Sequence, residues 1–146
     1  MATVIDIADA VVTALNGADG PKQGNPPVGL SAVRAYRPVY DLKDMKDLRV
    51  TVVPKGVEME MAGRGLLQSD VQVDVAVQKK LASGDNAEID SLMSFVEEVA
   101  EFIRAQGRLA GAAWVKTENL PIYSLEHMEQ LRQFTSVLTL TFRVMR

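Results

Sequence analysis

The side chains best suited to chemistry in this chain are Ser124 and His127, a hydroxyl and the single histidine. A catalytic serine needs a base from a separate element and a third residue that orients the base. Ser124 and His127 instead fall within one short helical turn, and no third partner follows at a usable spacing. We therefore predict that Ser124 caps a helix, that His127 has a surface or capping role, and that neither is catalytic.

The sequence predicts no metal site and no cofactor. The carboxylates nearest His127, Glu126 and Glu129, do not form a recognised metal-ligand spacing. The chain has no cysteine, which excludes a disulfide, a thiolate metal site and a cysteine nucleophile. The loosely spaced glycines between residues 17 and 29 match neither a phosphate loop nor a dinucleotide-binding fingerprint. These absences favour a protein that is not an enzyme.

Composition is that of an ordinary globular protein. The 146 residues are 47% hydrophobic and 24% charged, which fits a single domain over residues 1–146. The net charge of −3 gives no basic field, so we expect no sequence-specific nucleic-acid partner. Met1 to Asp6 lack the features of a secretory signal, and no apolar run approaches the roughly 18 residues of a membrane span. We therefore expect no membrane partner.

Two segments have helical spacing and several have the alternation of strands. The apolar spacing predicts helices over residues 4–16 and 87–106, with a turn and cap at 83–86. Strands are predicted at 32–40, 48–52, 71–78, 112–116 and 136–145, a loop at 18–29 and an exposed turn at 41–47. Pro54 is expected to end the second strand. The order of elements predicts an α+β fold with an antiparallel or mixed β-sheet and two helices packed on one face.

Residues 55–68 predict a long β-hairpin arm. Val57, Met59 and Met61 alternate with glutamates, as in a strand with one apolar face, and glycines at 63 and 65 can turn the chain back. An ordinary hairpin inside the sheet is the alternative. Because an isolated hairpin is marginal in water, the apolar face needs a neighbour to cover it. We predict a subunit interface that comprises Val57, Met59, Met61, Arg64 and Leu66.

Sheet edges also favour association. Pro38 can protect one edge, but the strand Val71 to Val77 has no comparable guard if it lies at the other edge.

Three segments carry a resemblance to a known family. The segments are Asp47-Leu48-Arg49-Val50-Thr51-Val52-Val53-Pro54, residues 71–81 and residues 134–142. In these segments the chain resembles small tail proteins of tailed bacteriophages, closest to the tail terminator (tail completion) family. The resemblance covers most of the chain, and the loop at 18–29 departs from it.

The resemblance implies a structural virion protein. Members of that family form homo-oligomeric, hexameric rings that cap the tail tube, stop its polymerisation and join the tail to the head connector. The implied partners are copies of the chain itself, the tail tube protein and the connector or neck proteins. The implied location is the tail or neck of the virion, after synthesis in the host cytoplasm.

Two alternatives stay open. One is another neck component, such as a head-closure or connector protein. The other is a small ligand-binding domain or hydrolase, which would require a pocket with convergent polar groups.

Overall fold

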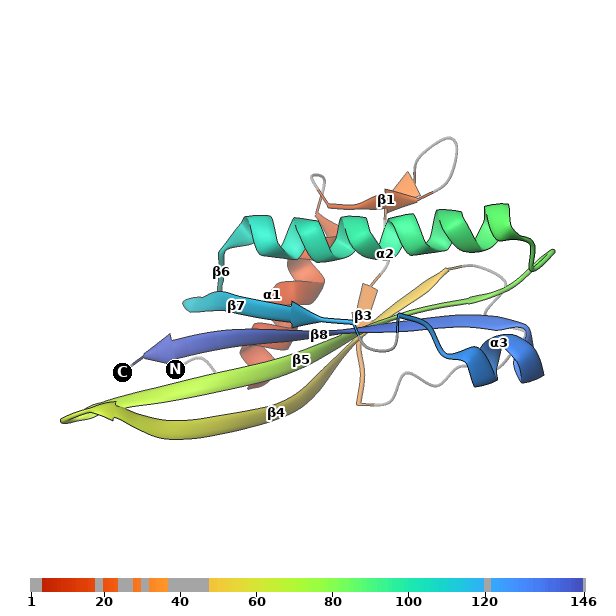
Figure 1. Ribbon diagram of the computed structural model, residues 1–146. Helices are drawn as coiled ribbons and strands as arrows, with labels where there is room; N and C mark the ends of the chain where they lie inside the picture. Colours follow the sequence, from red (N-terminus) through yellow and green to blue (C-terminus); the bar gives the residue numbers. More distant parts are fainter. Residues whose placement is uncertain are drawn as a thin grey trace.

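A computed structural model describes residues 4–17, 20–23, 28–29, 32–36, 48–119 and 122–145. Its centre is a curled six-stranded sheet with strand order β3-β4-β5-β8-β7-β6 (Figure 1). Strand β3 runs parallel to β4 and all other neighbours are antiparallel, so the sheet is mixed and the predicted α+β fold is confirmed. The strands are β3 (Ala32–Arg34), β4 (Arg49–Gly63), β5 (Leu66–Lys80), β6 (Arg108–Leu109), β7 (Ala112–Glu118) and β8 (Gln133–Met145).

One face of the sheet carries the hydrophobic core. Buried apolar residues recur at every second position along the middle of β5 and β8, and directly paired residues such as Val73 and Leu140, or Val75 and Leu138, share the apolar face. Helices α1 (Val4–Asn16) and α2 (Asn86–Gln106) complete a single core cluster with this face, as predicted. The helical residues buried there are Ile7, Ala8, Val11, Leu15, Leu92, Phe95, Val96, Val99 and Ile103.

Local signals explain the limits of α2. The Asp85 side chain accepts a hydrogen bond from the N–H of Glu88, which satisfies a free donor in the first turn. At the other end Gly107 adopts a φ of 72°, a conformation that favours glycine. The predicted helix over 87–106 is therefore confirmed to within one residue.

Helix α1 ends at Asn16 as predicted, and this residue ties it to the sheet. The Asn16 amide accepts from the N–H of Ala32 at 2.7 Å and donates to the carbonyl of the same residue at 2.9 Å. The spacing of Thr3 and Asp6 predicts a cap at the start of this helix, but Thr3 lies outside the described residues. The paired contacts hold the short parallel strand β3 beside α1.

Strand β4 corrects the expectation that Pro54 ends a strand. The strand runs unbroken from Arg49 to Gly63, and Pro54 pairs with Val73 of β5. The neighbouring β3 pairs with β4 only at residues 50–52, so no described strand lies on the outer side of Pro54. A proline is tolerated there because the missing N–H has no partner to lose.

Two further expectations change. Residues 18–29 are not all loop, because β1 (Lys22–Gln23) and β2 (Val28–Gly29) pair as a short antiparallel ladder. The Val71 to Val77 strand is not at an edge, because it lies in β5 between β4 and β8. The predicted turn at 41–47, Pro38 and the end of the strand at 37–40 lie outside the described residues.

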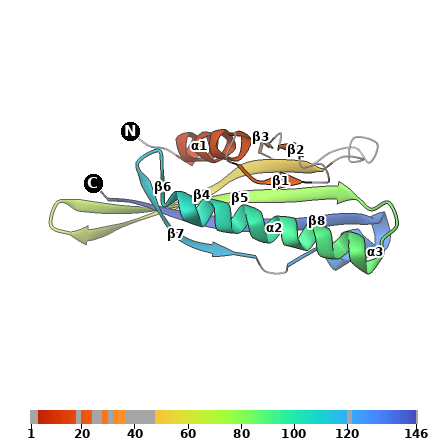
Figure 2. The ribbon, with the colours of Figure 1, turned by 90° about the horizontal axis from the view of Figure 1, so that it is seen from above.

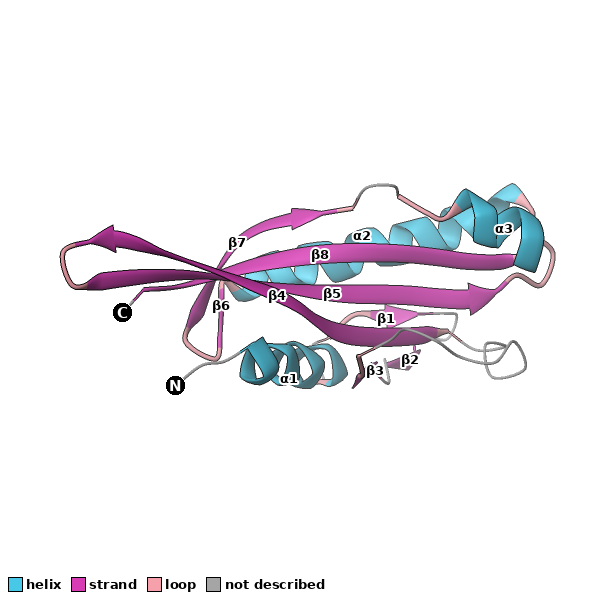
Figure 3. Cartoon of the chain, turned by 90° about the horizontal axis from the view of Figure 1, so that it is seen from below, coloured by secondary structure: helices cyan, strands magenta, loops and turns pink. Residues whose placement is uncertain are grey.

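The hairpin of β4 and β5 projects far beyond the helices. The two strands of 15 residues each are joined by a two-residue turn in which Gly65 has a φ of 72°. Seen from above and from below, the tip of this hairpin forms one end of the molecule (Figures 2 and 3). The short helix α3 (Leu125–Leu131) lies at the other end.

Candidate functional site

Three of the predicted interface residues lie together on the projecting hairpin. Val57, Met59 and Met61 pair opposite Val71, Ser69 and Leu67. Val71 belongs to the hydrophobic core, so all three side chains continue the apolar face of the sheet past the helices. Their exposed fractions rise toward the tip, from 45% at Val57 to 64% at Met59 and 76% at Met61. The hairpin therefore presents an uncovered strip of core-like surface.

A β-bulge keeps this strip on the core face. Pro54 pairs with Val73 and Gly56 with Gln72, so Lys55 is an extra residue in β4. The residues of β4 on the core face have even numbers before Lys55, as in Val50 and Val52, and odd numbers after it. One inserted residue restores the alternation, which would otherwise turn the later side chains to the opposite face.

The other two predicted interface residues lie apart from the strip. Arg64 is exposed in the turn at the tip, and Leu66 is 38% exposed at the start of β5. Leu66 and Leu67 are consecutive in a strand and so point to opposite faces. Leu67, which pairs with Met61 and is 40% exposed, therefore belongs to the apolar strip and was missed from the sequence. We call Val57, Met59, Met61 and Leu67 the arm strip.

The opposite face of the arm is polar and internally paired. Arg143 of β8 donates to both carboxylate oxygens of Asp70 at 2.8 and 3.1 Å, and these bonds hold the pKa of Asp70 below its ordinary value. A hollow of about 330 Å³ lies here, at the base of the arm. Of the three charged residues that line it, Asp70 is engaged with Arg143 and Lys116 with Glu118 at 3.0 Å, and Glu58 is exposed. Two of the three charged groups are thus already paired within the subunit.

Ser124 is confirmed as the cap of α3. Its Oγ accepts from the N–H of His127 at 3.3 Å, and its own N–H donates to the carbonyl of Thr135 at 2.9 Å. The Nδ1 of His127 lies 2.9 Å from the Thr135 hydroxyl. Both predicted residues thus attach α3 to β8. Within the described ranges, no group of three or more histidine, aspartate or glutamate side chains could hold a metal ion.

Among the carboxylates that the structure describes, Glu88 has the most strongly shifted pKa, and its role is local. Burial raises its pKa, but hydrogen bonds from the N–H groups of Ala82, Gly84 and Ser83 outweigh burial and lower the pKa to about 2. The Nζ of Lys79 adds an ion pair at 3.3 Å. Because these donors occupy the carboxylate, Glu88 fixes the loop between β5 and α2.

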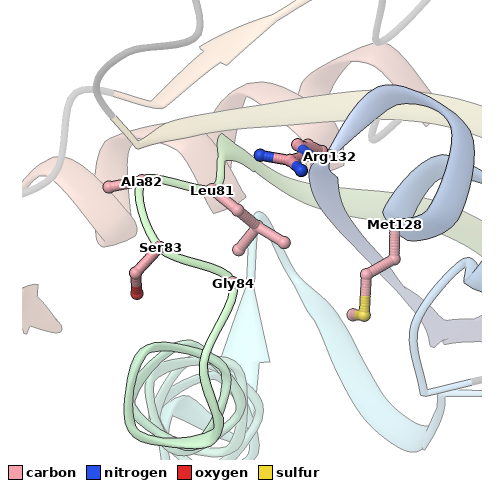
Figure 4. Close-up of a pocket in the computed structure, with 6 residues that line it drawn as sticks. All are labelled: Leu81, Ala82, Ser83, Gly84, Met128 and Arg132. Atoms are coloured by element: carbon pink, nitrogen blue, oxygen red, sulfur yellow. The ribbon is translucent and has the colours of Figure 1, made fainter.

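A second hollow opens at the end of the molecule opposite the arm. It has a volume of about 220 Å³ and lies between this loop and α3 (Figure 4). Leu81 and Met128 face it from the two sides, and Arg132 lies at its margin. Two exposed apolar residues of the same end, Ile122 at 49% and Leu125 at 55%, lie just before and at the start of α3.

No protein-family model matches this chain, and no curated protein sequence does. Among the described helices, none is both long enough and apolar enough to cross a membrane.

Proposed function

We propose that the chain is a structural subunit of a phage virion, which forms a homo-oligomeric ring on the tail tube, stops its polymerisation and joins the tail to the head connector. The resemblance of residues 47–54, 71–81 and 134–142 to tail terminator proteins supplies the identity of the assembly. The observation that carries an assembly role is the arm strip, a projecting hairpin face whose residues are 40% to 76% exposed.

An isolated hairpin is marginal in water, and the arm strip gives this one an apolar face that a neighbour can cover. Burying Val57, Met59 and Met61 against a neighbour contributes about 1.5–3 kcal/mol for each side chain. Ordering a free segment costs about 1–2 kcal/mol per residue, so apolar burial alone gives a small or unfavourable balance. Backbone hydrogen bonds to a neighbour supply the remainder, and β4 offers them because no described strand covers its outer edge from Val53 to Gly63.

This balance suits a ring that closes on a template. Subunits with marginal mutual affinity stay dispersed in solution and associate where the tube aligns them. The completed ring then matches the tube on one face and offers no docking surface for another tube subunit on the other. Termination is steric in this mechanism and requires no catalytic group.

The test is the mass of the assembly. Native mass spectrometry of the purified protein, alone and mixed with tail tubes from the same genome, should show a ring on the tubes. Replacing Met59→Asp together with Met61→Asp should leave the monomer folded and abolish the ring, because it places charges within the arm strip. Val115→Asp, at an exposed apolar residue of β7, is the matched control and should retain the ring.

Single copies per virion, or tubes that keep growing when saturated with the wild-type protein, would contradict the proposal. A ring that binds the head connector but leaves tube growth unchanged would instead identify another neck component.

A further inference from the structure

Two groups of exposed apolar residues lie at opposite ends of the described chain, apart from the exposed apolar residues on α1, near β3 and on β7. The arm strip occupies one end, while Ile122 and Leu125 lie at the other, beside the hollow that Leu81 and Met128 face. Figures 1 and 2 agree that the hairpin tip and α3 are at far ends of the sheet. The two surfaces therefore cannot cover one another within one chain.

The surface at the α3 end is held in place by hydrogen bonds. The helix is attached to β8 through the hydrogen bonds of Ser124 and His127 to Thr135. A bond of 2.8 Å from the N–H of Leu81 to the carbonyl of Arg132 connects the loop after β5 to the end of α3. Leu81 and Met128, which face the hollow, are therefore held at a set separation before any partner arrives.

Each end carries charges of both signs, and three exposed residues at the two ends are complementary to one another. Arg64 is the charged residue of the hairpin turn, and Glu126 and Glu129 are exposed on α3. None of these three residues forms an ion pair with another described residue. An arm tip laid on α3 places the guanidinium near two carboxylates, which favours this orientation of the arm.

One symmetric pairing of two arms, centred on Met59, is disfavoured by charge. If the outer edges of two β4 strands paired antiparallel about Met59, Glu58 of each copy would lie opposite Glu60 of the other. Like charges directly opposite one another destabilise a strand pair. That register of arm-to-arm pairing is therefore a poorer match than a surface that carries exposed carboxylates near Arg64.

We propose that the arm of one copy docks on the α3 end of a second copy, with Met61 directed into the hollow between Leu81 and Met128 and Arg64 beside Glu126 and Glu129. The inference rests on the proposed ring and specifies its subunit contact. Because one patch meets a different patch, each added copy leaves a free arm and a free α3 end until the ring closes.

Cysteine cross-linking tests the contact directly, because the chain has no cysteine of its own. A mixture of a Met61→Cys protein with a Met128→Cys protein, oxidised at high concentration or on tail tubes, should give a disulfide-linked pair containing one copy of each. A protein carrying both substitutions should give a ladder of linked copies. Pairing Met61→Cys with Ser94→Cys, an exposed position on α2, is the control and should give no link.

A charge exchange provides an independent measurement. Arg64→Glu should weaken ring formation several-fold, and Glu126→Arg combined with Glu129→Arg in the neighbouring copy should restore it. Restoration depends on contact between the two ends, so a purely local effect on folding would not produce it.

The failures of the two proposals are distinguishable. Rings without a link between positions 61 and 128, or links only between two copies of position 61, would overturn the docking and leave the ring function standing. Absence of any link, in solution and on tubes, would likewise overturn it. Continued tube growth despite a link between positions 61 and 128 would support the docking and overturn the capping function.

Discussion

At the scale of single residues, Glu88 shows how one carboxylate can organise the junction between β5 and α2. Its folded-state pKa of about 2 lies below the ordinary value of 4.5, because three backbone N–H groups and Lys79 favour the charged form. The difference corresponds to about 3 kcal/mol at neutral pH. A group with a depressed folded pKa contributes this stability above pH 4.5 and loses it as the pH falls toward 2.

We therefore expect Glu88→Gln to lower the free energy of unfolding at pH 7 by up to about 3 kcal/mol, because it removes the charge that the backbone donors stabilise. The difference between variant and wild type should shrink steadily below pH 4.5. Urea denaturation at a series of pH values measures both effects. Glu97→Gln, on the exposed face of α2, is the control and should change stability by less than about 0.5 kcal/mol. A loss of unfolding free energy that does not depend on pH would show that the shape of the Glu88 side chain, and not its charge, stabilises this junction.

A different prediction concerns Ser124 and His127, because both residues attach α3 to β8. Replacing Ser124→Ala should cost about 1 kcal/mol of stability through the lost cap. Adding His127→Ala should remove the contact with Thr135 without affecting any chemical step. Thermal unfolding, ring formation and virion infectivity of the double variant can be compared with wild type. Infectivity lost while the fold and ring stay intact would indicate chemistry at these residues.

At the scale of elements, the arm separates into a supported base and a free tip. Strand β8 pairs with β5 from Lys80 down to Gln68, so the last rungs of the hairpin, Met61 with Leu67 and Gly63 with Leu66, have no third strand among the described residues. On the other side β3 reaches only residues 50–52 of β4. Backbone groups toward the tip thus rely on the hairpin ladder alone, and such groups open most easily.

Hydrogen exchange should record this difference. We expect amides of residues 55–68 to exchange rapidly in the free subunit and to become protected on assembled tails, because a neighbour then covers the arm strip. Amides of Val71 to Val77 are the internal control and should be protected in both states, since β5 lies between β4 and β8. Strong protection of the arm in the free monomer would mean that the hairpin is stable by itself and that the arm hypothesis is wrong.

The elements also show what sequence patterns can and cannot predict. Helix α2 was predictable because apolar spacing, the Asp85 cap and Gly107 agree on its limits. The apolar face of the arm was predictable from alternation at Val57, Met59 and Met61. Leu67 was missed because its face depends on where the turn falls.

Other features depend on pairing between distant segments. The continuity of β4 through Pro54 rests on the lack of a strand beyond it, and the central position of β5 rests on its partners β4 and β8. Neither the continuity of β4 nor the central position of β5 can be predicted from the periodicity of one segment. The two-residue strands β1 and β2 are too short to show any periodicity.

At the scale of the whole molecule, folding and assembly use different parts of the same apolar face. Beneath the helices, residues such as Leu140 are fully buried and stabilise the subunit. Past the helices, the arm strip continues that face into solvent and is available to a neighbour. Substitutions beneath the helices should therefore lower stability, and substitutions in the arm strip should weaken association. A truncation such as Leu140→Ala costs about 2–5 kcal/mol of folding free energy.

The arrangement of contacts also predicts which oligomers form. A symmetric contact would stop at a dimer, whereas an arm docked on the α3 end leaves complementary surfaces free on every open chain. Native mass spectrometry over a range of concentrations, or on tubes, should show open intermediates of increasing size that give way to one closed species, expected to be the hexamer. Met61→Asp should shift the whole distribution to monomer, because charge at the tip of the arm strip weakens each contact equally. A dominant dimer that never grows would contradict the head-to-tail arrangement, since closure at two copies requires each patch to meet itself.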